Sequence, residues 1–239
     1  MNLFHGSTHV VERPVFGAGN PRNDFGRGFY CTESYALAGE WACKANTDGF
    51  INCYSLQLKE LVTLNLMDGS HTVLEWIALL LANRQFTPHS RLGRNVRDFL
   101  LDECFVDTAP YDIIVGYRAD DSYFSYAEDF VEGTLSVAEL SAALILGDLG
   151  LQVVVKSQRA FEALDFRGAE NAKASQYFPR FNSRDAKARG AYARGDFCGD
   201  SGDWSGALDE ARQIYALDLY RKEVAPCDEC IPRMLPQER

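Results

Sequence analysis

Segments that favour β-strands are short in this chain, and they alternate irregularly with segments that favour helices. The order does not repeat a strand–helix unit, so we expect an α+β fold rather than a doubly wound parallel sheet. β-Branched and aromatic residues predict strands over residues 28–32, 50–58, 111–117 and 152–156, with shorter ones near 3–8 and 61–66.

Apolar residues at helical spacing predict the helices between these strands. Thr32 is expected to cap a helix that ends near Asn46 or Gly49. From Arg167 onward the chain is polar and its pattern predicts helix, with a Gly- and Asp-rich break at 195–206. The other predicted helices cover residues 73–84, 96–104, 123–131, 137–146, 158–164 and 207–224. We therefore expect one domain over residues 1–194 and a C-terminal helical extension over 195–239 that packs on it.

The chain is acidic and has no long apolar segment. Its 34 acidic and 24 basic residues give a formal net charge of −10, which argues against a protein that coats nucleic acid through its bulk charge. No run of about 18 uncharged apolar residues occurs, so we expect no transmembrane helix. The first residues are neither basic nor apolar enough for a secretory signal, and we expect a cytoplasmic protein.

The cysteines do not suggest a disulfide framework. They number seven, an odd count at irregular spacing, in a chain long enough to form a core without cross-links. Cys227 and Cys230 form a single CxxC with no second pair or neighbouring histidine, whereas a structural zinc site normally has four ligands. We therefore expect no metal site, and we interpret most of the cysteines as small core residues.

Three separate segments carry residues suited to ligand binding. The first is His5-Gly6-Ser7 at the end of a short strand, the second is the run NDFGRGFYCT over residues 23–32, and the third is Gln152, which opens a late strand. Each alone has an ordinary structural explanation: a core histidine, a glycine-rich turn and a polar residue at a sheet edge. The glycines match neither the dinucleotide-binding nor the phosphate-loop pattern.

In combination, these segments resemble the ADP-ribosyltransferase superfamily. More narrowly, they resemble a bacterial family within it, domain-of-unknown-function family 3990. The resemblance covers roughly residues 3–192 and includes the pattern A..WA behind the second segment. Further matching positions are residues 112–116, 119–121 and 152–154, and the RD..AR pattern of Arg184, Asp185, Ala188 and Arg189.

The resemblance implies a split β-sandwich, in which two small sheets enclose a cleft that holds NAD in a bent shape. His5 would hydrogen-bond a ribose hydroxyl, and Ser7 would assist nearby. The backbone of Gly6 would pair with the nicotinamide carboxamide, which could approach closely because glycine has no Cβ. Tyr30 would stack on the nicotinamide ring, which is cationic before it leaves.

The glycine-rich loop is expected to contribute to the same NAD site. Asp24 and Gly26 lie in its turn, and Arg27 would meet the NAD pyrophosphate through charge-assisted hydrogen bonds. For Asp24 the structural alternative is a turn-capping side chain, and for Arg27 it is an ordinary surface arginine.

Gln152 departs from the pattern of many active members, which have a glutamate at this position. A carboxamide can hydrogen-bond a ribose hydroxyl but cannot act as a general base. Asp120 and Asp121 are the favoured carboxylates for that role, because adjacent acids just beyond a buried strand lie at a sheet rim. A solvated loop is the alternative for this pair, and Asp24 and Glu33 are the other nearby carboxylates.

We therefore expect a mono-ADP-ribosyltransferase that cleaves NAD, releases nicotinamide and transfers ADP-ribose to a macromolecular acceptor. The resemblance also implies a bacterial toxin of a toxin–antitoxin or phage-defence module, with an antitoxin protein as partner. Two alternatives remain: a non-catalytic module that binds NAD or ADP-ribose, which Gln152 favours, and an NAD glycohydrolase that uses water as the acceptor.

The acidic bulk charge favours a protein acceptor. A basic stretch over residues 180–194 leaves nucleic acid as an alternative acceptor. This stretch has five basic residues and one acid, with aromatic residues between them. The structural alternative is a helix that lies over the core and exposes a solvated basic face. It is favoured by the helical spacing of Arg184, Ala188 and Tyr192.

Overall fold

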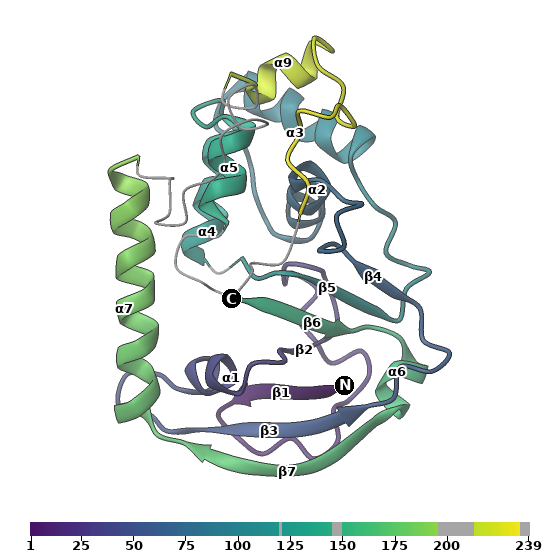
Figure 1. Cartoon of the computed structure of the whole chain (residues 1–239), viewed down its shortest axis with the longest axis vertical. Coiled ribbons are helices and arrows are strands. Elements are labelled where there is room, and N and C mark those ends of the chain that lie inside the picture. Colours follow the sequence, from purple (N-terminus) through teal and green to yellow (C-terminus); the bar gives the residue numbers. More distant parts are fainter. Residues whose placement is uncertain (120, 145–149, 196–212, 235–239) are drawn as a thin grey trace.

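Two small β-sheets form the centre of the computed structural model, which describes residues 1–119, 121–144, 150–195 and 213–234. Their strands are β1 (Asn2–Ser7), β2 (Phe29–Cys31), β3 (Gly49–Leu56), β4 (Thr63–Asn65), β5 (Ile113–Tyr117), β6 (Leu151–Val155) and β7 (Leu164–Ala172). One sheet is antiparallel, in the order β1-β3-β7. The other has the order β2-β6-β5-β4, in which only β4 and β5 are parallel neighbours. Figure 1 shows one sheet above the other.

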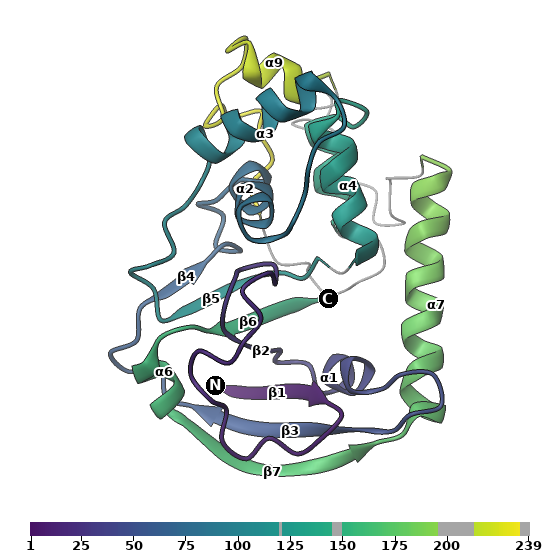
Figure 2. The same ribbon diagram turned by 180° about the vertical axis from the view of Figure 1, so that it is seen from behind.

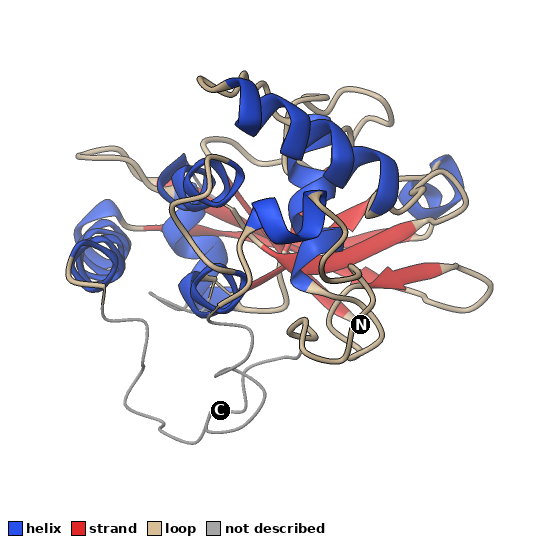
Figure 3. Ribbon diagram, turned by 90° about the horizontal axis from the view of Figure 1, so that it is seen from above, coloured by secondary structure: helices blue, strands red, loops and turns tan. Residues whose placement is uncertain are grey.

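Helices surround the strands, which run through the middle of the molecule when it is seen from above (Figure 3). The described helices are α1 (Tyr35–Ala42), α2 (Val73–Asn83), α3 (Arg91–Glu103), α4 (Asp121–Val131), α5 (Val137–Ala143), α6 (Gln158–Glu162), α7 (Ala174–Ala193) and α9 (Ala216–Tyr220). Four of them, α2 to α5, lie over the four-stranded sheet, and α7 stands at one side (Figures 1 and 2). None of the helices in the described ranges is long and apolar enough to cross a membrane.

The two sheets are joined by both backbone and side-chain contacts. Phe4 and Thr32 exchange two backbone hydrogen bonds of 2.8 and 2.9 Å, which link β1 to the end of β2. Leu3 and Tyr54 of one sheet pack with Val153 of the other in a shared apolar cluster. The mixture of small sheets and flanking helices is an α+β fold, as the sequence predicted.

The largest core is built around α2, because this helix is apolar on nearly its whole surface. Trp76, Ile77 and Leu80 have no exposed surface. The indole N–H of Trp76 donates to the carbonyl oxygen of Tyr117 at 3.1 Å and so ties α2 to β5. A capping box of Thr72 and Glu75 starts the helix.

Three local predictions were wrong. Ser34, not Thr32, caps α1, because Thr32 is held in the bridge to Phe4. The chain after Arg167 is not helical at once: β7 continues to Ala172, because it pairs with β3 along almost its whole length. The predicted helix over 207–224 is also too long, since α9 ends at Tyr220; its residues 207–212 lie outside the described part of the chain.

The described C-terminal residues, 213–234, pack into the main core. Ile214, Leu219, Ile231 and Met234 are buried there. The backbone of Met234 hydrogen-bonds both His71 and Gly69, at 2.9 and 3.2 Å, and so covers the segment that leads into α2. This segment therefore completes the hydrophobic core of the preceding elements.

Asp112 is a buried carboxylate that holds three segments together. It accepts hydrogen bonds from the backbone N–H of Val62 at 2.7 Å, from the hydroxyl of Ser157 at 2.5 Å and from the guanidinium of Arg159. The Arg159 guanidinium holds the pKa of this carboxyl well below its usual range. The contacts join the start of β5 to the residues before β4 and to α6.

Replacing this carboxylate tests its structural role. Asp112→Ala should lower the free energy of unfolding by about 2 kcal/mol, because it leaves three donors without their acceptor. Since the pKa of Asp112 is lowered by folding, its contribution is present at neutral pH and is lost as the pH falls below about 4. Urea denaturation at several pH values measures both effects. Asp165→Ala, which removes only an exposed pair with Arg167, should change little; equal losses in the two variants would contradict this role.

Candidate functional site

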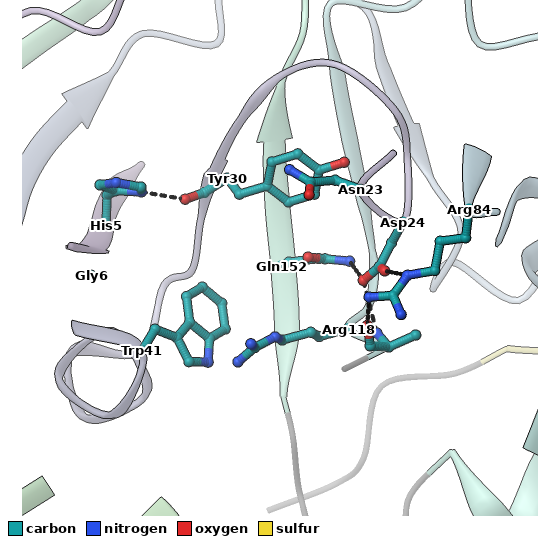
Figure 4. A pocket seen from close by; sticks show the side chains of 10 residues that line it. His5, Gly6, Asn23, Asp24, Tyr30, Trp41, Arg84, Arg118 and Gln152 are labelled. Atoms are coloured by element: carbon teal, nitrogen blue, oxygen red, sulfur yellow. Dashed lines mark hydrogen bonds and ion pairs between the residues drawn. The ribbon is translucent and has the colours of Figure 1, made fainter. Parts of the chain in front are cut away.

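A cavity of about 330 Å³ opens between the two sheets (Figure 4). It brings together residues that are far apart in the sequence: His5 from β1, Tyr30 from β2 and Gln152 from β6. The three segments singled out in the sequence therefore share one hollow. The residues that line it are His5, Gly6, Asn23, Asp24, Tyr30, Trp41, Arg84, Arg118, Ala119 and Gln152.

Other predicted site residues are not among the described residues that line this cavity. The hydroxyl of Ser7 donates to the carbonyl of His9 at 2.6 Å and accepts from the amide of Asn52 at 3.0 Å, so it stabilises the turn after β1. Arg27 is exposed, and Gly26 is buried next to the side chain of Asn83. Asp120 lies outside the described residues. Asp121 opens α4, but its side chain is likewise outside the described part.

His5 is neutral and presents one free acceptor nitrogen. Its Nδ1 lies 2.7 Å from the carbonyl oxygen of Tyr30, and because a carbonyl only accepts, Nδ1 must carry the proton. Burial lowers the pKa of His5 from its ordinary value, which favours the neutral ring at pH 7. The Phe29 ring, with its centroid 4.3 Å away, fixes the imidazole from one side. Nε2 is then the acceptor left for a ligand.

Gly6 is required for packing, a reason for the missing side chain that the sequence analysis did not consider. A Cβ at this position would lie 2.0 Å from the carbonyl oxygen of Ala38 and 2.7 Å from the backbone nitrogen of Ala42. The missing side chain therefore allows α1 to lie directly against β1. This close approach sets Trp41 of α1 into the cavity wall beside Gly6.

Tyr30 uses its hydroxyl to hold the loop that precedes it. The hydroxyl donates to the carbonyl of Gly26 at 2.7 Å and accepts from the backbone N–H of Phe25 at 3.0 Å. Burial raises the pKa of this phenol, so it stays protonated. The ring itself lines the cavity, with its polar end turned into the loop.

Asp24 is the buried carboxylate at the centre of the site. Its Oδ1 accepts from Nε of Arg84 at 2.7 Å, and its Oδ2 accepts from the backbone N–H of Ala119 and from Nε2 of Gln152, both at 2.9 Å. Burial raises the pKa of Asp24, whereas the Arg84 guanidinium lowers it. Every partner is a donor, and a proton on the carboxyl would displace one of them. The contacts therefore fit the ionised form.

Gln152 is positioned by the same carboxylate. Its amide nitrogen donates to Asp24 and, at 3.3 Å, to the carbonyl of Tyr117, which uses both of its hydrogens. The side chain is 3% exposed. Among the described residues no donor reaches its Oε1, which leaves one amide oxygen as an acceptor at the cavity. A glutamine is suited to this place because it can donate to a carboxylate that a glutamate would repel.

Several cavity residues were not predicted as site residues, although Trp41 belongs to the A..WA pattern. Trp41 and Arg118 form a pair in which the guanidinium carbon lies 4.7 Å from the centroid of the Trp41 ring, a cation–π contact. Arg84 follows the apolar helix α2 directly, and a lone cation at the end of such a helix is the one sequence signal that could have found it. Its partner Asp24 was predicted at the NAD site, with a turn-capping side chain as the structural alternative, but not as the carboxylate that binds Arg84.

Comparisons with known proteins give a family but no characterised relative. A family model described as "Protein of unknown function (DUF3990)" matches residues 1–166, a stretch that includes every described residue lining the cavity. No curated protein matches the chain, and no solved structure matches it.

The packing role of Gly6 can be separated from ligand binding. Gly6→Ala should lower the free energy of unfolding by at least about 2 kcal/mol, because its Cβ meets the backbone of α1 and neither element can yield. Gly190→Ala is the matched control: a Cβ there meets only the end of the Arg194 side chain, and the change should stabilise α7 by up to about 1 kcal/mol. Thermal and urea denaturation measure both, and a fully stable Gly6→Ala protein would contradict this role.

The donor role of Gln152 predicts how the stability of a Gln152→Glu variant depends on pH. Gln152→Glu places a second carboxylate against Asp24, so the pair must share a proton and one folded-state pKa rises above its unfolded value. The variant should be less stable than the wild type at pH 7.5 and should recover part of the loss as the pH falls toward 5. Urea denaturation at both pH values tests this. The exposed control Gln158→Glu should show little change, and identical pH profiles for wild type and Gln152→Glu would exclude the contact.

Proposed function

The chain belongs to the DUF3990 family of proteins of unknown function, and from that membership and the cavity we propose that it is a mono-ADP-ribosyltransferase with NAD as its substrate. The reaction would break the bond between nicotinamide and ribose, release nicotinamide and join ADP-ribose to a macromolecular acceptor. The observation that carries the proposal is the meeting of His5, Tyr30 and Gln152 in one cavity between two small sheets. We infer that these sheets are the split β-sandwich of the ADP-ribosyltransferase superfamily.

His5 is suited to hold the ribose next to nicotinamide. Its Nε2 is an acceptor, and burial keeps the ring neutral, so a ribose hydroxyl can donate to it. The amide oxygen of Gln152 offers a second acceptor at the cavity. Two fixed acceptors would orient the sugar, and orientation is a major part of catalysis in a reaction of this kind.

The aromatic and charged side chains suit the charge changes of the reaction. Nicotinamide is cationic while it is attached to ribose, and the ring face of Tyr30 would attract it by stacking and cation–π contact, at about 0.5–2 kcal/mol. As the bond breaks, positive charge moves to the ribose, and the fixed carboxylate of Asp24 would stabilise that charge electrostatically. Arg118, stacked on Trp41, is a cavity cation that would meet the pyrophosphate through charge-assisted hydrogen bonds.

The acceptor nucleophile still needs a base. Gln152 cannot serve, and the contacts of Asp24 with three donors leave it little capacity to take a proton. Our proposal therefore keeps Asp120 and Asp121 as the base candidates. They follow Arg118 and Ala119, both of which line the cavity.

Two related functions would use the same cavity. A non-catalytic module that binds NAD or ADP-ribose is favoured by the carboxamide of Gln152, which removes the usual carboxylate from that position. An NAD glycohydrolase would differ only in using water as acceptor. As part of the proposal, the transferase acts inside a bacterial cell as a toxin that an antitoxin partner neutralises.

Labelled NAD separates these functions directly. The protein incubated with labelled NAD and a cell lysate should release nicotinamide and label a macromolecule. His5→Ala should lower the rate about 100-fold, because the ribose loses its acceptor and its orientation, whereas the exposed control His89→Ala should not. Tyr30→Phe keeps the ring and should retain more activity than Tyr30→Ala.

The other outcomes discriminate between the candidates. Nicotinamide release without labelling of any macromolecule would indicate a glycohydrolase. Calorimetric binding of NAD without turnover would indicate the binding module. If wild type neither binds nor cleaves NAD, the proposal is wrong.

A further inference from the structure

The helix α7 carries a line of basic residues at a constant interval. Lys173, Arg180, Lys187 and Arg194 are spaced seven residues apart, from the N-cap to the C-cap of the helix. We call these four residues the basic stripe. Seven residues advance an α-helix by two turns less about 20°, so Arg180, Lys187 and Arg194 lie along one side of the helix, about 10 Å apart. Lys173 is the extended N-cap at its start. All four are exposed.

The face of α7 next to the stripe, three or four residues from its members, is committed to packing. Tyr177, Ala188 and Ala191 are buried, and Tyr192 stacks on Tyr126 of α4 with 3.8 Å between ring centroids. An ion pair between Arg184 and the buried Glu40 ties the middle of the helix to α1. The expected helix over the core is therefore confirmed, and the stripe is the edge of it that remains available.

The sequence of α7 itself offers little negative charge to neutralise the stripe. Between residues 173 and 194 the one acid is Asp185, which pairs with Arg189 on another side of the helix. Within the described ranges, no carboxylate forms an ion pair with Arg180, Lys187 or Arg194, and Lys173 alone of the stripe does so, with Asp48. A local positive line on a chain of net charge −10 concentrates attraction for anions on this one helix.

The helix α7 is linked to the cavity through α1. The helix α1 lies between them: Glu40 binds Arg184 of α7, and the next residue, Trp41, lines the cavity. Tyr177 of α7 packs so closely on α1 that a Cβ at Gly39 would lie 2.4 Å from its ring. A macromolecule that binds along α7 is thus held beside the helix that forms one cavity wall.

We propose that the basic stripe of α7 binds the phosphate backbone of a single-stranded nucleic acid. A nucleic-acid strand offers anions continuously, so it can satisfy evenly spaced cations in any register, whereas a protein would need acids at a matching interval. Arg180, whose guanidinium carbon lies 5.7 Å from the centroid of the Tyr177 ring, is held in place for such a contact. The inference that the stripe holds the acceptor of the reaction rests on the proposed function. The inference that it binds nucleic acid does not.

Fluorescence anisotropy without NAD tests the surface alone. Labelled single-stranded RNA and DNA probes of about 20 nucleotides are titrated with the whole chain from about 50 to about 200 mM salt. Binding should weaken steeply with salt, and Arg180→Ala/Lys187→Ala/Arg194→Ala should weaken it at least about tenfold and reduce the log–log salt slope by about 2. Alanine favours helix, so α7 should persist, which circular dichroism can check.

A control with the same change in charge makes the result specific. Lys44→Ala/Lys59→Ala/Arg91→Ala removes three exposed cations elsewhere and should bind as the wild type does. No binding by wild type, or equal binding by both triple variants, would overturn the proposal. Competition by polyglutamate as effective as by RNA would also overturn it, in favour of an acidic protein. The relative affinity of RNA and DNA identifies the strand that is bound.

A failure of the stripe to bind nucleic acid is distinguishable from a failure of the proposed function. The stripe variant retains every described residue that lines the cavity, so its release of nicotinamide from NAD should equal that of wild type. Loss of nucleic-acid binding with normal nicotinamide release supports the stripe as a separate surface.

Discussion

The buried carboxylate of Asp24 is the interaction on which the site depends. Taking a carboxylate out of water is costly, and here the cost is offset by one guanidinium and two further donors. These donors come from the end of α2, from the residue pair after β5 and from the start of β6. A single charge therefore fixes four segments of the chain around one cavity, and the loss of any donor leaves the rest with an incompletely paired buried ion.

Under the proposed function, this arrangement would prepare the cavity for NAD before it binds. Tyr30 holds the loop of Asp24 by two hydrogen bonds, and its carbonyl fixes the tautomer of His5. Two acceptors remain free, Nε2 of His5 and Oε1 of Gln152. The carbonyl of Tyr30 orients the first, and the carboxylate of Asp24 orients the second. Preorganised polar groups in a site that excludes water contribute most to catalysis, because they need no rearrangement when charge develops.

Much of the fold was predictable where the local pattern decides the structure. Runs of β-branched residues identified β5 and β6, and apolar spacing identified α2, because burial demands those residue types. The strand β7 was missed because it is a polar edge strand stabilised by pairing with β3, which the local sequence does not encode. At the site, His5, Tyr30 and Gln152 were found through their motif. The roles of Arg84, Trp41 and Asp24 were missed because they arise only from contacts between distant segments.

A crystal structure of the protein with NAD bound would examine this account most directly. The account predicts electron density for the dinucleotide between the two sheets, with a ribose hydroxyl on Nε2 of His5, the nicotinamide against Tyr30, and Asp24 still bound by Arg84 and Gln152. A dinucleotide found elsewhere on the protein, or a cavity left empty at saturating NAD, would contradict it.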